Sequence, residues 1–130
     1  MLTVANVQGA KLATTLFFGV TSGALTGKPA SLPSGDLVND GYLFAPLSSF
    51  SGDDLSNDVL QNLSFMEDNL TNVTVNSATD FTGSDFTGAN LTGSDFSSAI
   101  LTSVTWADTT CPDTTNSNDD GYTCAGHLIP

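Results

Sequence analysis

The sequence predicts an all-β solenoid, in which short extended segments alternate with corners. Large apolar residues recur every five positions, with small or polar residues between them. A period of five fits neither the 3.6-residue period of an α-helix nor the two-residue period of a flat strand. The chain must therefore turn at every unit, so that the large side chains point to a common axis and successive coils pair through their backbones.

The five-residue period is most regular between residues 50 and 106. It passes through Phe50, Leu55, Leu60, Phe65, Leu70 and Val75 and, after one extra residue, through Phe81, Phe86, Leu91, Phe96, Leu101 and Trp106. Chance does not account for so long a run. Eight Phe residues and one Trp also argue against a disordered chain.

The units between residues 78 and 106 share a residue pattern as well as a period. Each has a small residue, then Asp or Asn, then Leu or Phe, then two polar or small residues. This pattern resembles the pentapeptide-repeat family. Its central pairs are Asp80-Phe81, Asp85-Phe86, Asn90-Leu91 and Asp95-Phe96, its inward small residues are Ser84, Ala89, Ser94 and Ala99, and its corners are Thr82-Gly83, Thr87-Gly88 and Thr92-Gly93.

The resemblance implies a right-handed quadrilateral β-helix with four units per coil, about four coils and a solid core. Residues about twenty apart should then stack in columns. The expected columns are Phe50 on Leu70 on Leu91, Leu55 on Val75 on Phe96, Leu60 on Phe81 on Leu101, and Phe65 on Phe86 on Trp106. The extra residue should form a bulge between Val75 and Phe81.

A chain of 130 residues is long enough for one hydrophobic core, so we expect a single domain over residues 1–130. Residues 1–19 keep the five-residue spacing and are predicted to form a first coil. Residues 20–47 break the spacing and are predicted to be an inserted loop. Three repeat coils should follow over residues 48–106, and residues 107–130 should form a cap that contains both cysteines.

Three aspartates depart from the repeat pattern. Asp53, Asp58 and Asp68 occupy positions that should be small and point inward. An unpaired carboxylate is costly to bury. We therefore expect distorted corners at which these side chains cap turns and meet water. The alternative is a coil that packs more loosely than those after it.

The tail contains Cys111 and Cys124. A zinc site would need two further ligands, and His127 is the one candidate nearby. We therefore expect a disulfide, which indicates an oxidising compartment. The tail also resembles a cysteine-bearing C-terminal cap of some bacterial pentapeptide-repeat proteins, although Thr114 stands where that resemblance implies Gly.

The same tail is rich in oxygen-bearing side chains. The candidate ligands for a calcium ion are Asp113, Asn116, Asn118, Asp119 and Asp120. No Glu closes the loop, so the alternative is an Asx-rich turn bridged by the disulfide. We expect no other cofactor. His127 has no Ser or Cys nucleophile in a recognisable setting, so we expect no enzymatic activity either.

The charge balance is strongly acidic. Fourteen Asp and Glu residues stand against Lys11 and Lys28, for a net charge of −12. Direct binding to DNA or RNA needs Lys and Arg to displace counterions, so this balance argues against it. The sequence also has no apolar run that approaches the roughly 20 residues of a membrane-spanning helix.

Two functions remain open. The first is a structural, assembly or surface-decoration subunit of a coat, filament, virion or cell surface, which would contact other protein subunits, including copies of itself, outside the cytoplasm. The second is an acidic mimic of DNA that binds DNA gyrase and inhibits or protects it, as the resemblance implies for some family members. Free thiols in place of the disulfide would favour the second function and a cytoplasmic location.

Overall fold

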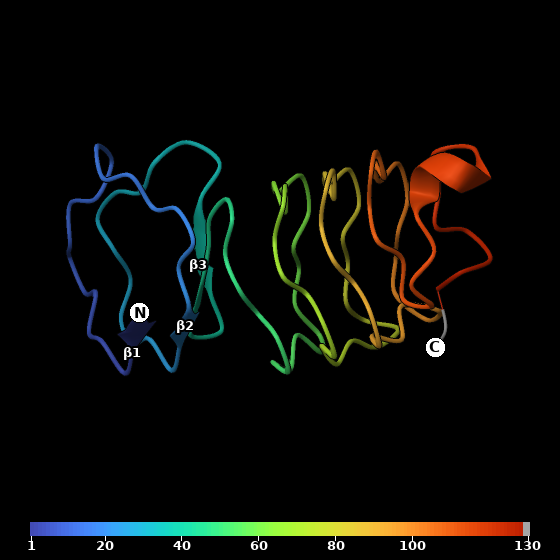
Figure 1. The fold of residues 1–130 in the computed structure, drawn as a ribbon. Coiled ribbons are helices and arrows are strands. Elements are labelled where there is room, and N and C mark those ends of the chain that lie inside the picture. Colours follow the sequence, from blue (N-terminus) through green and yellow to red (C-terminus); the bar gives the residue numbers. More distant parts are fainter. Residues whose placement is uncertain (129–130) are drawn as a thin grey trace.

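The computed structural model describes residues 1–128 (Figure 1). The chain winds along one long axis, with the first coil at one end and the cysteine-containing cap at the other. All but one of the isolated parallel bridges join residues 20 or 21 positions apart, such as Ser49 with Asn69 and Ser64 with Asp85; the exception, Thr21 with Ser49, spans the hairpin. The chain is therefore a β-helix.

Regular elements are short because each coil contributes one or two paired residues per side. Strand β1 (Leu2–Thr3) pairs in parallel with β2 (Ser22–Gly23). Strands β3 (Leu37–Asn39) and β4 (Tyr42–Phe44) form an antiparallel hairpin. The 3-10 helix η1 (Ser117–Asp120) lies in the cap.

The loop that we expected over residues 20–47 is shorter in the structure. Residues 21–31 form part of a second coil, in which Asn6 bridges Thr26 and Lys11 bridges Ser31. The repeat is hidden there because Ser22 and Gly27 replace the large apolar residues that reveal the period elsewhere. The expectation of a loop that starts at residue 20 was wrong for this reason.

The β3–β4 hairpin is the part of the spacer that leaves the repeat. Asp40 and Gly41 both adopt positive φ angles, 44° and 85°, as a two-residue hairpin turn requires. The hairpin carries Phe44 into the main core, where its ring stacks on Phe50 with centroids 4.9 Å apart. The five-residue period did not identify Phe44 as a core residue, because it lies outside the repeat register.

Aromatic rings form a continuous column through the core. The Phe86 ring lies between Phe65 and Trp106, with centroid distances of 4.9 Å and 5.2 Å and nearly parallel planes. The backbone pairing has the same register, since the N–H of Phe65 donates to Asp85 and that of Phe86 to Thr105. These three rings occupy the positions expected from the spacing of the repeat.

The pairing changes at the extra residue. Asp54 bridges Thr74, 20 positions on, whereas Val59 bridges Asp80, 21 positions on. The residues between Thr74 and Asp80 form a turn in which the N–H of Thr79 donates to the Asn76 carbonyl. In the last repeat coil, the N–H of Phe96 donates to the Leu128 carbonyl of the tail.

Corners depend on residues with positive φ, two positions after the large apolar residue. Gly83, Gly88 and Gly93 have φ angles of 71° to 76°. At Gly83, an added Cβ would lie 2.5 Å from the Asn62 side-chain oxygen of the preceding coil. A residue with a Cβ there would be strained and would have to displace the Asn62 side chain, so the corner favours glycine.

Asp and Asn precede the large apolar residue because their side chains close the corner. Each side-chain oxygen accepts a hydrogen bond from the backbone N–H two residues later, as an Asx turn does. The pairs are Asn6–Gln8, Asp54–Ser56, Asn69–Thr71, Asp80–Thr82, Asp85–Thr87, Asn90–Thr92, Asp95–Ser97 and Asp113–Thr115, at 2.8 to 3.1 Å. Asp and Asn are interchangeable in this role, so the role does not itself require charge.

We predict that Phe86→Ala lowers the free energy of unfolding by about 3–5 kcal/mol, because it leaves a cavity between two rings in the centre of the core. Urea titration followed by the fluorescence of the single tryptophan, Trp106, measures the change. Phe18→Ala is the matched control, since Phe18 is 60% exposed and its loss should change stability by no more than about 0.5 kcal/mol. Equal effects of the two substitutions would refute the assigned core.

Candidate functional sites: buried carboxylates and the disulfide-closed cap

Two of the three unusual aspartates are buried, contrary to our expectation that they meet water. Asp68 has no exposed surface, and Asp58 is 5% exposed. One carboxylate oxygen of each, Oδ2, has no hydrogen-bond partner. Asp53 is partly exposed and alone resembles the expected arrangement. The coils close around Asp58 and Asp68 because their backbone register is set by the neighbouring coils.

At the same inward position of later units, a serine hydroxyl makes two hydrogen bonds to the backbone. The Ser84 hydroxyl donates to the Leu60 carbonyl at 2.7 Å and accepts from the Leu63 N–H at 3.1 Å. Ser94 makes the same pair of bonds to the Leu70 carbonyl and the Val73 N–H. Each hydroxyl thus joins two backbone groups of the preceding coil, which satisfies both its donor and its acceptor capacity.

Asp68 accepts a backbone hydrogen bond as Ser84 and Ser94 do, but it donates none. Its Oδ1 accepts from the Ser48 N–H at 2.7 Å. Burial raises the pKa of Asp68 to about 8, although hydrogen bonds from the Ser48 and Leu47 backbones oppose the shift. Asp68 is therefore mostly protonated at pH 7, and a neutral acid occupies a position that a hydroxyl fills elsewhere.

Asp58 lies under the hairpin. Its Oδ1 accepts from the Asn39 side chain, at the end of β3, at 2.7 Å. Burial raises the pKa of Asp58 to about 6, and the negative charges of Asp40 and Asp54 contribute to the shift. The bond to Asn39 joins the hairpin to the repeat coils.

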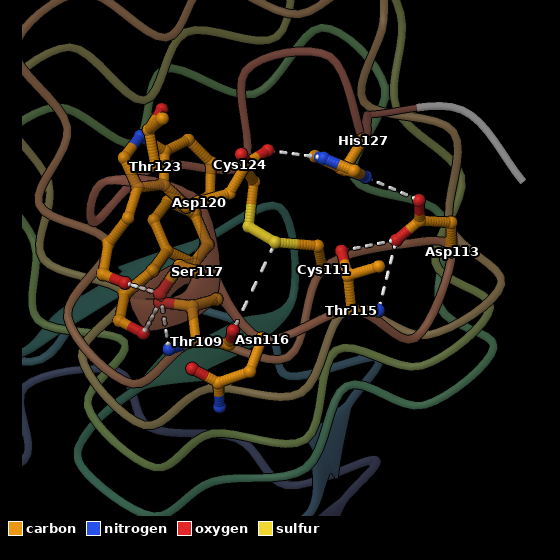
Figure 2. Close-up of a disulfide and its surroundings, with 12 residues drawn as sticks. Thr109, Cys111, Asp113, Thr115, Asn116, Ser117, Asp120, Thr123, Cys124 and His127 are labelled. Atoms are coloured by element: carbon orange, nitrogen blue, oxygen red, sulfur yellow. Dashed lines mark hydrogen bonds and ion pairs between the residues drawn. A yellow bond between two sulfur atoms is a disulfide. The ribbon is translucent and has the colours of Figure 1, made fainter.

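Cys111 and Cys124 form the expected disulfide, with Cα atoms 5.5 Å apart (Figure 2). Both half-cystines are fully buried and belong to the same core cluster as Trp106. The bond closes a loop that folds over the end of the β-helix. Thr114 in this loop has a φ of 77°, a conformation that favours Gly and is strained for a β-branched residue.

Ser117 anchors the cap to the last coil. Its hydroxyl donates to the Trp106 carbonyl and accepts from the Thr109 N–H, and its own N–H donates to the Thr109 carbonyl. Asn116 caps η1 by accepting from the Asn118 N–H. These bonds cover the exposed edge of the last coil, as a terminal cap of a repeat protein must.

His127 lies between two carboxylates of the cap (Figure 2). Its Nδ1 is 2.6 Å from Asp113, and its Nε2 pairs with Asp120. Carboxylates only accept hydrogen bonds, so this geometry requires both ring nitrogens to be protonated. The hydrogen bonds to Asp113 and Asp120 raise the pKa of His127. His127 is therefore protonated and bonded to both carboxylates below about pH 6.5, and this pair of bonds is lost as pH rises through the raised pKa. The Thr115 hydroxyl and then His127 lower the pKa of Asp113 to about 2.

Four of the five oxygen-bearing side chains suggested for calcium make hydrogen bonds to other side chains, and the fifth, Asp119, is exposed. Asp113 and Asp120 hold His127, while Asn116 and Asn118 both donate to Asp108. Within residues 1–128, no group of three or more His, Cys, Asp or Glu side chains could hold a metal ion. The arrangement corresponds to the alternative, an Asx-rich turn bridged by the disulfide.

Comparison with known families identifies the repeated segment. A model of pentapeptide repeats (8 copies) matches residues 77–105. This segment belongs to the pentapeptide-repeat family. The match confirms the family that the residue pattern indicates, and it covers the most regular part of the β-helix. No curated protein and no solved structure matches this chain.

The helices that the structure describes do not include one long and apolar enough to cross a membrane.

We predict that Asp68→Asn stabilises the protein increasingly as pH rises. The folded-state pKa of Asp68 is raised, so the wild-type carboxyl is most favourable below about pH 4 and least favourable above about pH 8. Asn keeps an acceptor for Ser48 and cannot ionise. The pKa shift of Asp68 from 3.8 to about 8 corresponds to a gain in unfolding free energy on the order of 6 kcal/mol at pH 9, which should vanish toward pH 4.

Denaturant titrations from pH 4 to 9 measure this difference. Asp54→Asn is the matched control, because hydrogen bonds from Ser56 lower the pKa of Asp54 and its ionised form is the favoured one. The control should therefore lose stability above pH 4. A pH-independent difference between Asp68→Asn and wild type would show that Asp68 is not a buried neutral acid.

A further prediction concerns the disulfide. Its reduction should lower stability by up to about 3 kcal/mol on the chain-entropy account and expose Trp106 to water. The middle coils should remain folded, because each depends mainly on its neighbours. A red shift of tryptophan emission with nearly unchanged circular dichroism is the expected result. The reductant should not affect a Cys111→Ala/Cys124→Ala variant, and an unshifted emission of the reduced wild type would contradict the cap.

Proposed function

We propose that this pentapeptide-repeat protein is a non-enzymatic structural or assembly subunit that acts through contacts with other protein subunits, copies of itself included. Its shape in this role is the right-handed quadrilateral β-helix that the family resemblance implies. A coat, a filament, or the surface of a virion or cell is the setting. The disulfide is compatible with an oxidising environment of this kind.

The observation that carries this proposal is the incompletely covered first coil. Leu2, Val7, Leu12 and Phe17 occupy the inward positions of the repeat but remain half-exposed. Their counterparts in the third coil, Phe50, Leu55, Leu60 and Phe65, are fully buried. Val4, Leu16 and Phe18 of the first coil are also exposed, at 78%, 81% and 60%. An apolar surface of this kind is typical of a protein contact.

The alternative, an acidic mimic of DNA that binds gyrase, is favoured by the net charge of −12. The positions of the acidic side chains on the β-helix give less support to DNA mimicry. Asp80 has Val59 and Ile100 as its bridged neighbours on the adjacent coils, so this side carries no continuous row of charge. Asp and Asn also alternate freely in the Asx turns, and Asp68 is largely uncharged at neutral pH.

Two measurements distinguish these functions. Negative-stain electron microscopy and sedimentation of the oxidised protein over a range of concentrations should show particles, sheets or fibres. A supercoiling assay with purified gyrase should show neither inhibition nor protection. Monomers at every concentration together with gyrase inhibition at micromolar protein would replace the assembly proposal by the mimic.

A further inference from the structure

The two ends of the β-helix are chemically different. At the C-terminal end, the disulfide loop and η1 cover the last coil. At the other end, the backbone hydrogen bonds that residues 1–20 make to other coils all lead to residues 21–49. Within residues 1–128, the outer edge of the first coil therefore has backbone groups without a partner from another coil, beside half-exposed core residues. Such an edge is a template for another chain.

Charge is also divided between the ends. Residues 1–35 contain Lys11 and Lys28 and no Asp or Glu, so every acidic residue lies at Asp36 or later. Both lysines are exposed on the first two coils. The cap carries Asp108, Asp113, Asp119 and Asp120 within thirteen residues. The first two coils are thus basic, while the cap, which lies at the opposite end of the long axis (Figure 1), is acidic.

The cap offers an apolar group as well. Tyr122 is 68% exposed and has a φ of 62°, directly after Gly121 at 72°. A tyrosine in this conformation is strained and has no cover from its own chain. Exposed Tyr residues are enriched at protein contacts because they combine a large apolar surface with a hydroxyl. Asp119, on η1 and three residues before Tyr122, is also exposed.

We propose that the first coil of one copy seats on the acidic cap of a second copy, so that the β-helices associate head to tail. Lys11 and Lys28 would face the cap carboxylates, and the half-exposed first coil would be covered by the cap around Tyr122. This contact uses different surfaces on the two copies, so it does not close and generates a filament. The inference rests on the proposed assembly function and names its interface.

The other two end-to-end contacts lack this complementarity. Two first coils meeting would place four lysines together without a carboxylate from residues 1–35. Two caps meeting would place eight aspartates together. Like charges at a contact cost free energy, whereas opposite charges attract and orient the partners. Charge therefore favours the head-to-tail arrangement over both symmetric ones.

Variants damaged at one end only provide the test. The head variant is Lys11→Glu/Lys28→Glu/Phe18→Ser, and the tail variant is Asp119→Lys/Tyr122→Ser. Each should sediment as a monomer under conditions in which wild type forms open-ended oligomers. An equimolar mixture should form a heterodimer, because each variant keeps the surface that the other lacks. Melting temperatures of both variants check that the altered surface residues leave the fold intact.

Salt dependence provides a second readout. Wild-type oligomers should weaken at least about tenfold in dissociation constant between about 0.01 M and 1 M NaCl, where the Debye length falls from about 30 Å to 3 Å. Lys11→Arg/Lys28→Arg keeps the charge and should assemble as wild type does.

Three results would overturn the inference. These are a wild type that stays monomeric at low salt, a tail variant that still forms a two-fold dimer, and variant mixtures that stay monomeric. Assemblies that persist when both ends are altered would also refute the head-to-tail contact, yet would leave the proposed assembly function standing with a lateral interface. Failure of the interface and failure of the function are therefore distinguishable.

Discussion

Each coil of this β-helix depends on its neighbours for both hydrogen bonds and hydrophobic cover. The backbone N–H of Phe50 donates to the Asn69 carbonyl, that of Leu70 to the Asn90 carbonyl, and that of Leu91 to the Thr110 carbonyl. The coils therefore keep one backbone register. The same register stacks Phe65, Phe86 and Trp106. A short five-residue unit cannot bury its own large side chain, and stacking is the arrangement that allows it to do so.

This dependence explains why the sequence predicts some parts of the structure better than others. The β-helix, the aromatic column and the glycine corners follow from residue type and a fixed spacing. The second coil does not, because Ser22 and Gly27 carry no apolar signal and are placed by pairing with the coil before them. Neighbouring coils likewise bury Asp68, which sequence reasoning placed in water by considering its unit alone. The cysteine spacing indicated the disulfide, whereas the clamp of Asp113 and Asp120 on His127 depends on a loop path that no local pattern specifies.

Part of the net charge of −12 has a local structural origin. Every Asx turn needs an acceptor at one position, and Asp or Asn supplies it equally well, as Asp85 and Asn90 show in successive units. Five of the fourteen acidic residues accept in these turns, so part of the acidity arises without any requirement for a charged partner. Net charge alone therefore gives weak support to a DNA-mimic function, whereas the distribution of charge between the two ends is more informative.

The coil at each end of a solenoid lacks a neighbouring coil on one side. Each terminal coil has an unpaired edge and an apolar layer with one face uncovered. In this chain, Ser117 and the disulfide solve the problem at the last coil within the same molecule. The first coil has no such cover within residues 1–128, and its Leu16 and Phe18 are among the most exposed large apolar residues. Because the interior coils pair with each other on both sides, the first coil is the part of residues 1–128 whose inward apolar side chains have the least cover, and the proposed head-to-tail contact would supply that cover.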